Sequence, residues 1–128
     1  MIGVIGAGNL ASALVRGWGE PVLLTDSGSG RAEELAKEVD GTACELNSTL
    51  AKLADVVVLC HKPQQLGEVA AEIAPNTEVV ISTLARVTLD ELQAAYPKAK
   101  VARVMPSSAY VRPDAKSIRR LESSVSLD

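Results

Sequence analysis

The sequence predicts an α/β fold, a doubly wound parallel sheet of about six strands with helices on both faces. Two observations predict it. Short apolar runs alternate along the chain with segments of helical periodicity. A glycine-rich turn also follows the first apolar run and precedes the first helical segment. Strands that alternate with helices pair through right-handed crossovers, so we expect the strand order 3-2-1-4-5-6.

Six short apolar runs are the predicted strands. The clearest of them is Val-Val-Val-Leu-Cys at residues 56–60, which is β-branched and too short for a helix. Its apolar character throughout is typical of a strand that is covered on both faces. In chain order, the expected strands are residues 2–5, 22–25, 42–44, 56–60, 78–82 and 100–105.

The segments between these runs have helical features. Residues 9–17 are rich in small side chains, and residues 64–74 place apolar side chains at i, i+3, i+4 and i+7. Asn47 is a suitable N-cap for a third helix, and Thr88 with Glu91 fits a capping box. In chain order, we expect helices at residues 9–17, 31–39, 48–54 and 64–74, one that begins after Thr88, and a last one near residues 114–121.

Length and composition indicate one ordinary globular domain. The chain has 128 residues, of which 47% are hydrophobic and 23% charged, so it can bury a core without disulfide support. We expect residues 1–106 to form this domain and residues 107–128 to be a C-terminal extension or the start of a further helical domain. With a formal net charge of −3 and 2% aromatic residues, a nucleic-acid partner is not expected.

The sequence also predicts a cytoplasmic location without a membrane partner. Its longest apolar run, residues 56–60, is far shorter than the ~20 residues of a membrane span. The N-terminus lacks the basic region of a signal peptide. The chain has only two cysteines, as expected for a protein of a reducing compartment.

The glycine-rich turn predicts a dinucleotide-binding site. Residues 6–11, Gly-Ala-Gly-Asn-Leu-Ala, match the pattern G-x-G-x-x-A. In this pattern Gly6 permits a tight turn, Gly8 lets the backbone approach a pyrophosphate, and Ala11 allows close packing of helix on strand. The helix N-terminus adds amides and a positive dipole end. A glycine turn that serves packing alone is the alternative, and the strand–turn–helix context favours binding.

Asp26, at the end of the second expected strand, has two interpretations. An acidic residue about 20 residues after the glycine turn can accept hydrogen bonds from the adenosine ribose, which favours NAD(H). A carboxylate in a polar loop can equally form an Asx turn. Ser27, Ser29 and Arg31 follow it, and they could hold the 2′-phosphate of NADP(H). These residues alone leave the choice of cofactor nearly balanced.

The segment Cys60, His61, Lys62 and Pro63 follows the fourth expected strand, at the sheet edge where ligands of this fold bind. His61 is the only histidine and titrates near neutral pH, so proton donation is one interpretation. A contact from the loop is the other, and we favour it because no carboxylate or second histidine adjoins His61. The cysteines and His61 lack the spacing of a zinc site, so no metal site is expected.

Several motifs, in the same order, resemble the N-terminal half of pyrroline-5-carboxylate reductase, and they are residues 5–14, 54–59, 62–64, 79–82, 87–89 and 103–106. This family reduces a cyclic imine to L-proline by hydride transfer from NAD(P)H, usually NADPH. The resemblance therefore favours NADP(H), with NAD(H) as the alternative. The cofactor contacts that the resemblance implies are Ile5, Gly6, Ala7, Gly8, Asn9, Leu10, Asp26, Asn47, Cys60, His61, Lys62, Pro63, Thr83, Leu84 and Ala85. Ser27 and Arg31 of the polar loop are the further expected contacts.

The sequence departs from the family pattern at three places. Cys60 and His61 replace a usual Ala-Val, and Arg86 stands where glycine is usual. Residues 107–109 replace a usual Asn-Thr-Pro. The family's helical C-terminal domain, which forms the dimer and supplies the substrate's proton donor, has no counterpart in these 128 residues.

We therefore expect the cofactor-binding domain of an NAD(P)H-dependent reductase that acts on a small imine. Any homo-oligomer would form through a C-terminal domain outside this sequence. Ser107 and Ser108 are expected near the substrate and His61 near the cofactor, and no catalytic residue is assigned. The alternatives are a related imine or F420-linked NADP oxidoreductase and a non-catalytic nucleotide-binding or regulatory module, which Arg86 and Ser107 would favour.

Overall fold

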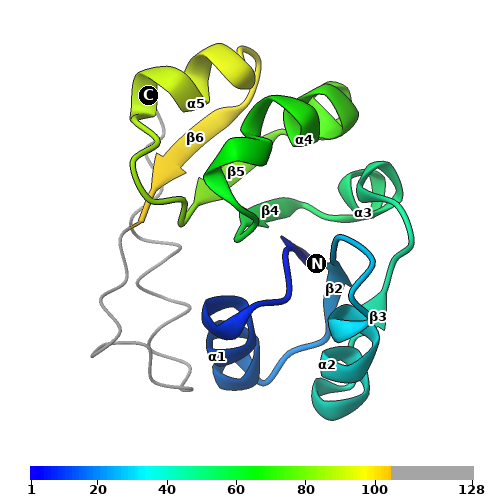
Figure 1. Cartoon of the computed structure of the whole chain (residues 1–128). Coiled ribbons are helices and arrows are strands. Elements are labelled where there is room, and N and C mark those ends of the chain that lie inside the picture. Colours follow the sequence, from blue (N-terminus) through cyan, green and yellow to red (C-terminus); the bar gives the residue numbers. More distant parts are fainter. Residues whose placement is uncertain (105–128) are drawn as a thin grey trace.

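The structure, a computed structural model, describes residues 1–104. They form a sheet of six parallel strands in the order β3-β2-β1-β4-β5-β6 (Figure 1), which confirms the predicted fold class and strand order. The strands are β1 (Ile2–Ile5), β2 (Val22–Thr25), β3 (Thr42–Ala43), β4 (Val56–Leu59), β5 (Val79–Ser82) and β6 (Lys100–Arg103). Ser107, Ser108, the domain boundary at residue 106 and the helix expected near residues 114–121 lie outside the described residues.

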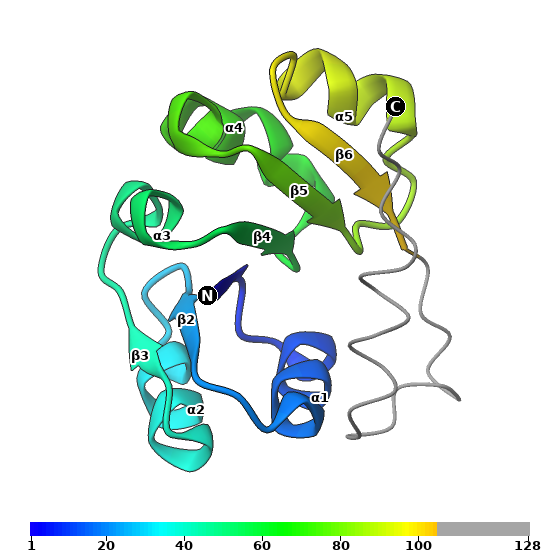
Figure 2. The ribbon, with the colours of Figure 1, turned by 180° about the vertical axis from the view of Figure 1, so that it is seen from behind.

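Helices cover both faces of the sheet, as Figures 1 and 2 show from opposite sides. One face packs against α1 and α2, and the other packs against α3, α4 and α5. The helices are α1 (Asn9–Trp18), α2 (Arg31–Val39), α3 (Asn47–Leu53), α4 (Leu66–Ile73) and α5 (Leu89–Ala95), with short 3-10 turns η1 (Pro63–Gln65) and η2 (Ala74–Asn76).

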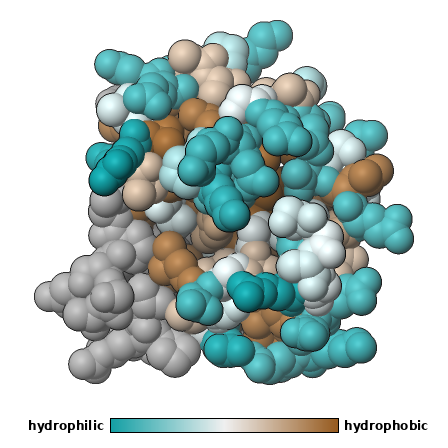
Figure 3. Space-filling model, viewed as in Figure 1, coloured by the Kyte–Doolittle hydropathy of each residue, from teal (hydrophilic) through white to brown (hydrophobic). Residues whose placement is uncertain are grey.

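Two apolar clusters form the core, one on each face of the sheet. Successive strand residues alternate between them, so that Val4 and Leu24 face α1 and α2 while Ile5 and Leu23 face the opposite helices. The strands are apolar throughout because both faces are covered. The outer surface seen in Figure 3 is mostly hydrophilic. Among the described residues, none of the helices has the length and apolar character of a membrane span.

The register of the central strands brings their carboxyl ends together. Ile5 of β1 pairs with Thr25 of β2 and with Leu59 of β4, and Leu59 in turn pairs with Ser82 of β5. The loops that follow these four residues therefore leave the sheet at one edge. This is the edge at which parallel α/β sheets bind their ligands.

Two predicted helix starts are wrong, one because of a tertiary contact and the other because of a local turn. Asn47 is not an N-cap, because α3 begins at Asn47 itself and Leu46 is the cap. The Asn47 side chain instead accepts a hydrogen bond from Thr25. The helix expected over residues 64–74 is divided into η1 and α4, and the turn is held by a bond from the Lys62 amide to Gln65 Oε1. Thr88 caps α5 as predicted.

Candidate functional site

A groove of about 500 Å³ runs along the carboxyl edge of the sheet. The glycine turn after β1 and the loops after β2 and β4 form its walls. Most of the predicted cofactor contacts meet there. The groove is lined by Gly6, Ala7, Gly8, Asp26, Ser27, Ser29, Arg31, Asn47, Cys60, His61, Lys62, Pro63, Gln65 and Val69.

The other predicted contacts do not line this groove, and they are Ile5, Asn9, Leu10, Thr83, Leu84 and Ala85. The side chains of Ile5 and Leu84 belong to the core. Gln65 and Val69 also line the groove, although they are not among the predicted contacts. Their helical spacing of i and i+4 after the β4 loop would have placed them on one face, but nothing in the sequence said that this face borders the loop.

Gly6 forms part of the floor of the groove, where the turn after β1 meets the end of β4. Its φ of +105° is a conformation that favours glycine, and its amide donates to the Thr25 carbonyl oxygen at 2.9 Å. A β-carbon at Gly6 would lie 2.6 Å from the Cys60 carbonyl oxygen and 2.9 Å from the His61 nitrogen. Glycine is therefore required at this position both by the turn and by the close approach of the β4 end.

Gly8 differs from Gly6, because nothing within residues 1–104 requires glycine there. Its φ of −79° suits any residue, and a β-carbon would meet no atom within 4 Å. The open space is the groove itself. No side chain among the described residues caps α1, and its first turn contains no acidic residue. Gly8 thus leaves the amides and the positive dipole end of α1 open to an anion in the groove.

Asp26 organises the loop that begins α2, and its Asx-turn interpretation is confirmed. Its Oδ1 accepts from the Gly28 amide at 2.7 Å, and its Oδ2 accepts from the Ala32 amide at 2.7 Å. Burial raises the pKa of the Asp26 carboxyl, but the hydrogen bonds from Ala32, Gly28 and Ser29 outweigh burial and leave the pKa below its usual value. The carboxylate is therefore charged at neutral pH, and backbone amides already surround part of it.

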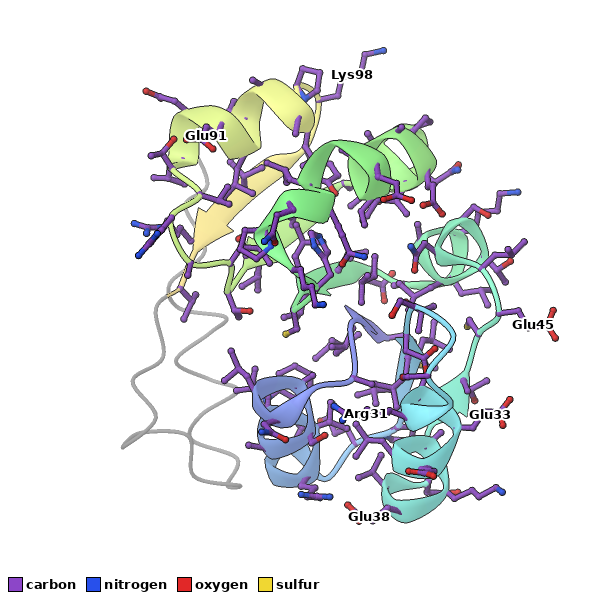
Figure 4. All side chains as sticks on the ribbon, in the orientation of Figure 1. Arg31, Glu33, Glu38, Glu45, Glu91 and Lys98 are labelled. Carbon is purple, nitrogen blue, oxygen red and sulfur yellow. The ribbon has the colours of Figure 1, made fainter. Side chains whose placement is uncertain are left out.

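Arg31 supplies one of the two cationic side chains that line the groove in the described part of the chain. It is the first residue of α2, it is exposed, and its side chain lies between α1 and α2 (Figure 4). Within the described part of the chain Arg31 has no salt-bridge partner, whereas Arg16 pairs with Glu38 across the same two helices. Ser27 and Ser29 stand beside Arg31 at the groove wall. This wall can bind an anionic group by charge and by hydroxyl donors.

Asn47 reaches the groove from the start of α3. Its Oδ1 accepts a hydrogen bond from the Thr25 hydroxyl at 2.6 Å. Thr25 is only 1% exposed, so this bond lies behind the groove wall. With its oxygen in use, the Asn47 carboxamide keeps its Nδ2 donor for the groove.

His61 and Lys62 have different electrostatic roles although they are neighbours. His61 Nδ1 lies 2.8 Å from the Lys62 carbonyl oxygen, which can only accept, so Nδ1 carries the proton. Burial lowers the pKa of His61, and the bond to Lys62 offsets this only in part. The lowered pKa therefore favours the neutral ring, with its proton on Nδ1. The exposed Lys62 side chain supplies the second cation of the groove.

Cys60 lines the groove at the end of β4, and its thiol has low reactivity. The Thr83 hydroxyl donates to the Leu59 carbonyl oxygen at 2.7 Å and lies 3.4 Å from the Cys60 sulfur. Burial raises the pKa of the Cys60 thiol to about 11, so the thiol is protonated and weakly nucleophilic at neutral pH. Residues 1–104 contain no group of three or more His, Cys, Asp or Glu side chains that could hold a metal ion.

The sequence is similar to a known protein family and to reductases of known name. The family model described as "NADP oxidoreductase coenzyme F420-dependent" matches residues 1–86. A pyrroline-5-carboxylate reductase of Synechocystis is 29% identical over 116 residues, which are 84% of this chain and 43% of that protein. The chain therefore spans less than half the length of this relative.

Solved structures agree with the sequence matches. A pyrroline-5-carboxylate reductase of Coxiella burnetii superposes with a TM-score of 0.78 and 26% identity, over 86% of this chain and 45% of that chain. A pyrroline carboxylate reductase of Plasmodium falciparum, solved with NADP bound, has a TM-score of 0.72 and 22% identity over 86% and 43% of the two chains. The predicted resemblance to these reductases is confirmed.

Proposed function

Because this chain belongs to the family described as NADP oxidoreductase, coenzyme F420-dependent, we propose that it binds an NADP-type dinucleotide in the groove at the carboxyl edge of its sheet. The observation that carries the proposal is the start of α1. Among the described residues nothing packs against the place of a Gly8 side chain and no side chain caps α1, whose N-terminus opens onto the groove. A pyrophosphate fits both the positive dipole end and the missing side chain.

The groove residues have separate tasks in this proposal. The amides of the α1 N-terminus bind the pyrophosphate, and Lys62 adds a positive charge from the loop after β4. Asn47 and the loop after β2 border the adenosine half, since that half lies over the first three strands of this fold. Cys60 and His61 supply a floor of low charge, because burial disfavours the charged form of each side chain.

The loop after β2 favours NADP(H) over NAD(H) in this proposal. Asp26 opposes a 2′-phosphate, at a cost on the order of 1 kcal/mol when the two groups are well solvated. However, both Asp26 oxygens already accept backbone amides. Arg31 has a guanidinium without a salt-bridge partner among residues 1–104, and a charge-assisted bond to phosphate contributes about 1.5–3 kcal/mol. Arg31 therefore offsets the repulsion, and membership in a family described as NADP oxidoreductase decides the choice for NADP(H).

The reaction that we propose is hydride transfer to the imine carbon of a small cyclic imine. The reduced nicotinamide supplies the hydride when it is bound, and the groove holds it at the sheet edge. Substrate and reaction come from the relatives named pyrroline-5-carboxylate reductase, of which this chain spans less than half. A homo-oligomer through further residues remains a prediction, as does the cytoplasmic location.

Titration with NADPH tests the proposal, with nicotinamide fluorescence as the readout and two glycine variants beside the wild type. Gly8 and Gly67 both have open space where a β-carbon would stand. Gly67 lies on α4, on the side opposite to Gln65 and Val69, and does not line the groove. We expect saturable binding by the wild type and by Gly67→Ala, and at least about tenfold weaker binding by Gly8→Ala. No saturable binding at millimolar NADPH would refute the proposal.

A second candidate is a non-catalytic nucleotide-binding module. Arg86 favours it, because this exposed cation has a φ of +62° in the loop after β5, where the reductases that the sequence resembles have glycine. Cofactor binding without turnover of cyclic imines supports this candidate. Formation of proline from pyrroline-5-carboxylate and NADPH eliminates it.

A further inference from the structure

We infer that Thr25 is a positioning residue of the groove, whose hydroxyl fixes the carboxamide of Asn47 so that its Nδ2 group is the donor presented to the adenosine half of the dinucleotide. The ligand's identity rests on the proposed function. The Thr25–Asn47 hydrogen bond does not depend on the proposed function, because it is present in the unliganded protein.

Thr25 connects the two walls of the groove. It is the last residue of β2 and is 1% exposed. Its carbonyl oxygen accepts the Gly6 amide at 2.9 Å, and its hydroxyl donates to Asn47 Oδ1 at 2.6 Å. One buried residue therefore holds both the glycine turn and the first residue of α3. Thr25 itself does not line the groove, so it acts through Asn47.

The orientation of the Asn47 carboxamide matters because its two ends are chemically opposite. Rotation by half a turn exchanges an acceptor oxygen for a donor nitrogen, and the two forms have nearly the same shape. The Thr25 hydroxyl has one proton, which it gives to the Asn47 oxygen. The Nδ2 group of Asn47 is then left for the groove, which Asn47 lines together with Asp26 and Ser27.

A fixed donor at this place suits the adenosine half of a dinucleotide. Asn47 begins α3, directly after the strands β1 to β3, and that half of the fold binds the adenosine portion. Ribose oxygens, phosphate oxygens and adenine ring nitrogens all accept hydrogen bonds. The nearby Asp26 carboxylate is an acceptor only, so Asn47 supplies the neutral donor that Asp26 cannot.

A double-mutant cycle tests this inference, with NADPH as the probe and nicotinamide fluorescence as the readout. Thr25→Val keeps the shape and removes the hydroxyl, and we expect it to weaken NADPH binding about three- to tenfold. Thr25→Ser keeps the hydroxyl and should bind within about twofold of the wild type. In an Asn47→Ala background, Thr25→Val should cause no further loss. The inference would be overturned if Thr25→Val weakened NADPH binding in the Asn47→Ala background as much as it does in the wild type. It would also be overturned if Thr25→Ser bound NADPH as weakly as Thr25→Val.

The NMR spectrum of the unliganded protein separates this inference from the proposed function. The side-chain amide signals of Asn47 should move in Thr25→Val and stay close to their wild-type positions in Thr25→Ser. If the wild type does not bind NADPH, the proposed function fails, while these signals still decide the role of Thr25. Asn47 signals that are unchanged in Thr25→Val would contradict it, whatever the titration shows.

Discussion

A β-carbon on Gly6 would lie 2.6 Å from the carbonyl oxygen of Cys60. The turn after β1 can therefore approach the end of β4 only because residue 6 has no side chain. The contact fixes the position of the glycine turn relative to the β4 loop. Gly6 and Cys60 therefore form the floor of the groove, and Gly8 lines the open part above it.

Gly6→Ala should therefore destabilise the fold, whereas Gly8→Ala should not. The Gly6 variant combines a strained φ of +105° with a clash against backbone, and we expect it to lose about 2 kcal/mol or more of the free energy of unfolding. Gly8→Ala should stay within about 0.5 kcal/mol of the wild type. Urea denaturation measures both. Equal losses at the two positions would contradict the different roles assigned to them.

Arg31→Ala should weaken NADPH binding by about tenfold or more and leave NADH binding nearly unchanged, because only NADPH carries the 2′-phosphate that the guanidinium would bind. Lys37→Ala is the matched control, since it removes a cation from the last turn of the same helix. Fluorescence titrations with both cofactors measure the effect. If both cofactors lost affinity equally, Arg31 would have no role at the 2′-phosphate. A wild-type preference for NADH would make Asp26 the deciding residue.

Protonation of His61 should lower the stability of the fold as the pH falls below about 6.5, the ordinary pKa of histidine. Burial holds the pKa of His61 below that value in the folded protein, so the unfolded chain takes up the proton first. The stabilising contribution is complete above the ordinary pKa and is lost as the pH falls through the folded pKa. His61 is the only histidine, so denaturation of His61→Asn at pH 7 and pH 5 should give a smaller difference than the wild type. An unchanged difference would count against the lowered pKa.

Tyr96→Phe should leave the fold as stable as the wild type or more stable by up to about 1 kcal/mol. Tyr96 is 1% exposed, and its hydroxyl has no hydrogen-bond partner among the described residues. The hydroxyl has lost its water without gaining a bond, so its removal leaves no partner unsatisfied. Thermal unfolding of the two proteins measures the difference. A loss above about 1 kcal/mol would mean that the hydroxyl has a partner.

Fold class and strand order were predictable because each depends on patterns along the chain. Short apolar runs and helical periodicity give the alternation, and the glycine turn identifies β1 as a central strand of a dinucleotide fold. Asp26 was predictable in part, since an Asx turn needs only its neighbours. The bond from Ala32 to its second oxygen depends on where α2 begins relative to the loop, which the sequence left open.

The role of Asn47 shows why the rest was not predictable. Its sequence context suits an N-cap, but a buried hydroxyl on a different strand uses its side chain. Thr25 and Asn47 are distant in the sequence, and only the pairing of β2 with its neighbours brings them together. The same limit applies to Gln65 and Val69, which line the groove only because the chain after β4 folds back beside it.

The central claim is that the N-terminus of α1 holds the pyrophosphate of an NADP-type dinucleotide. Backbone amide NMR shifts measured during a titration with NADPH test it most directly. The account predicts saturable shifts that are largest at residues 8–11, with further shifts at Ser27, Arg31 and Lys62, and none at Gly67. Saturable binding whose shifts avoid residues 8–11, or no binding at millimolar NADPH, would contradict it.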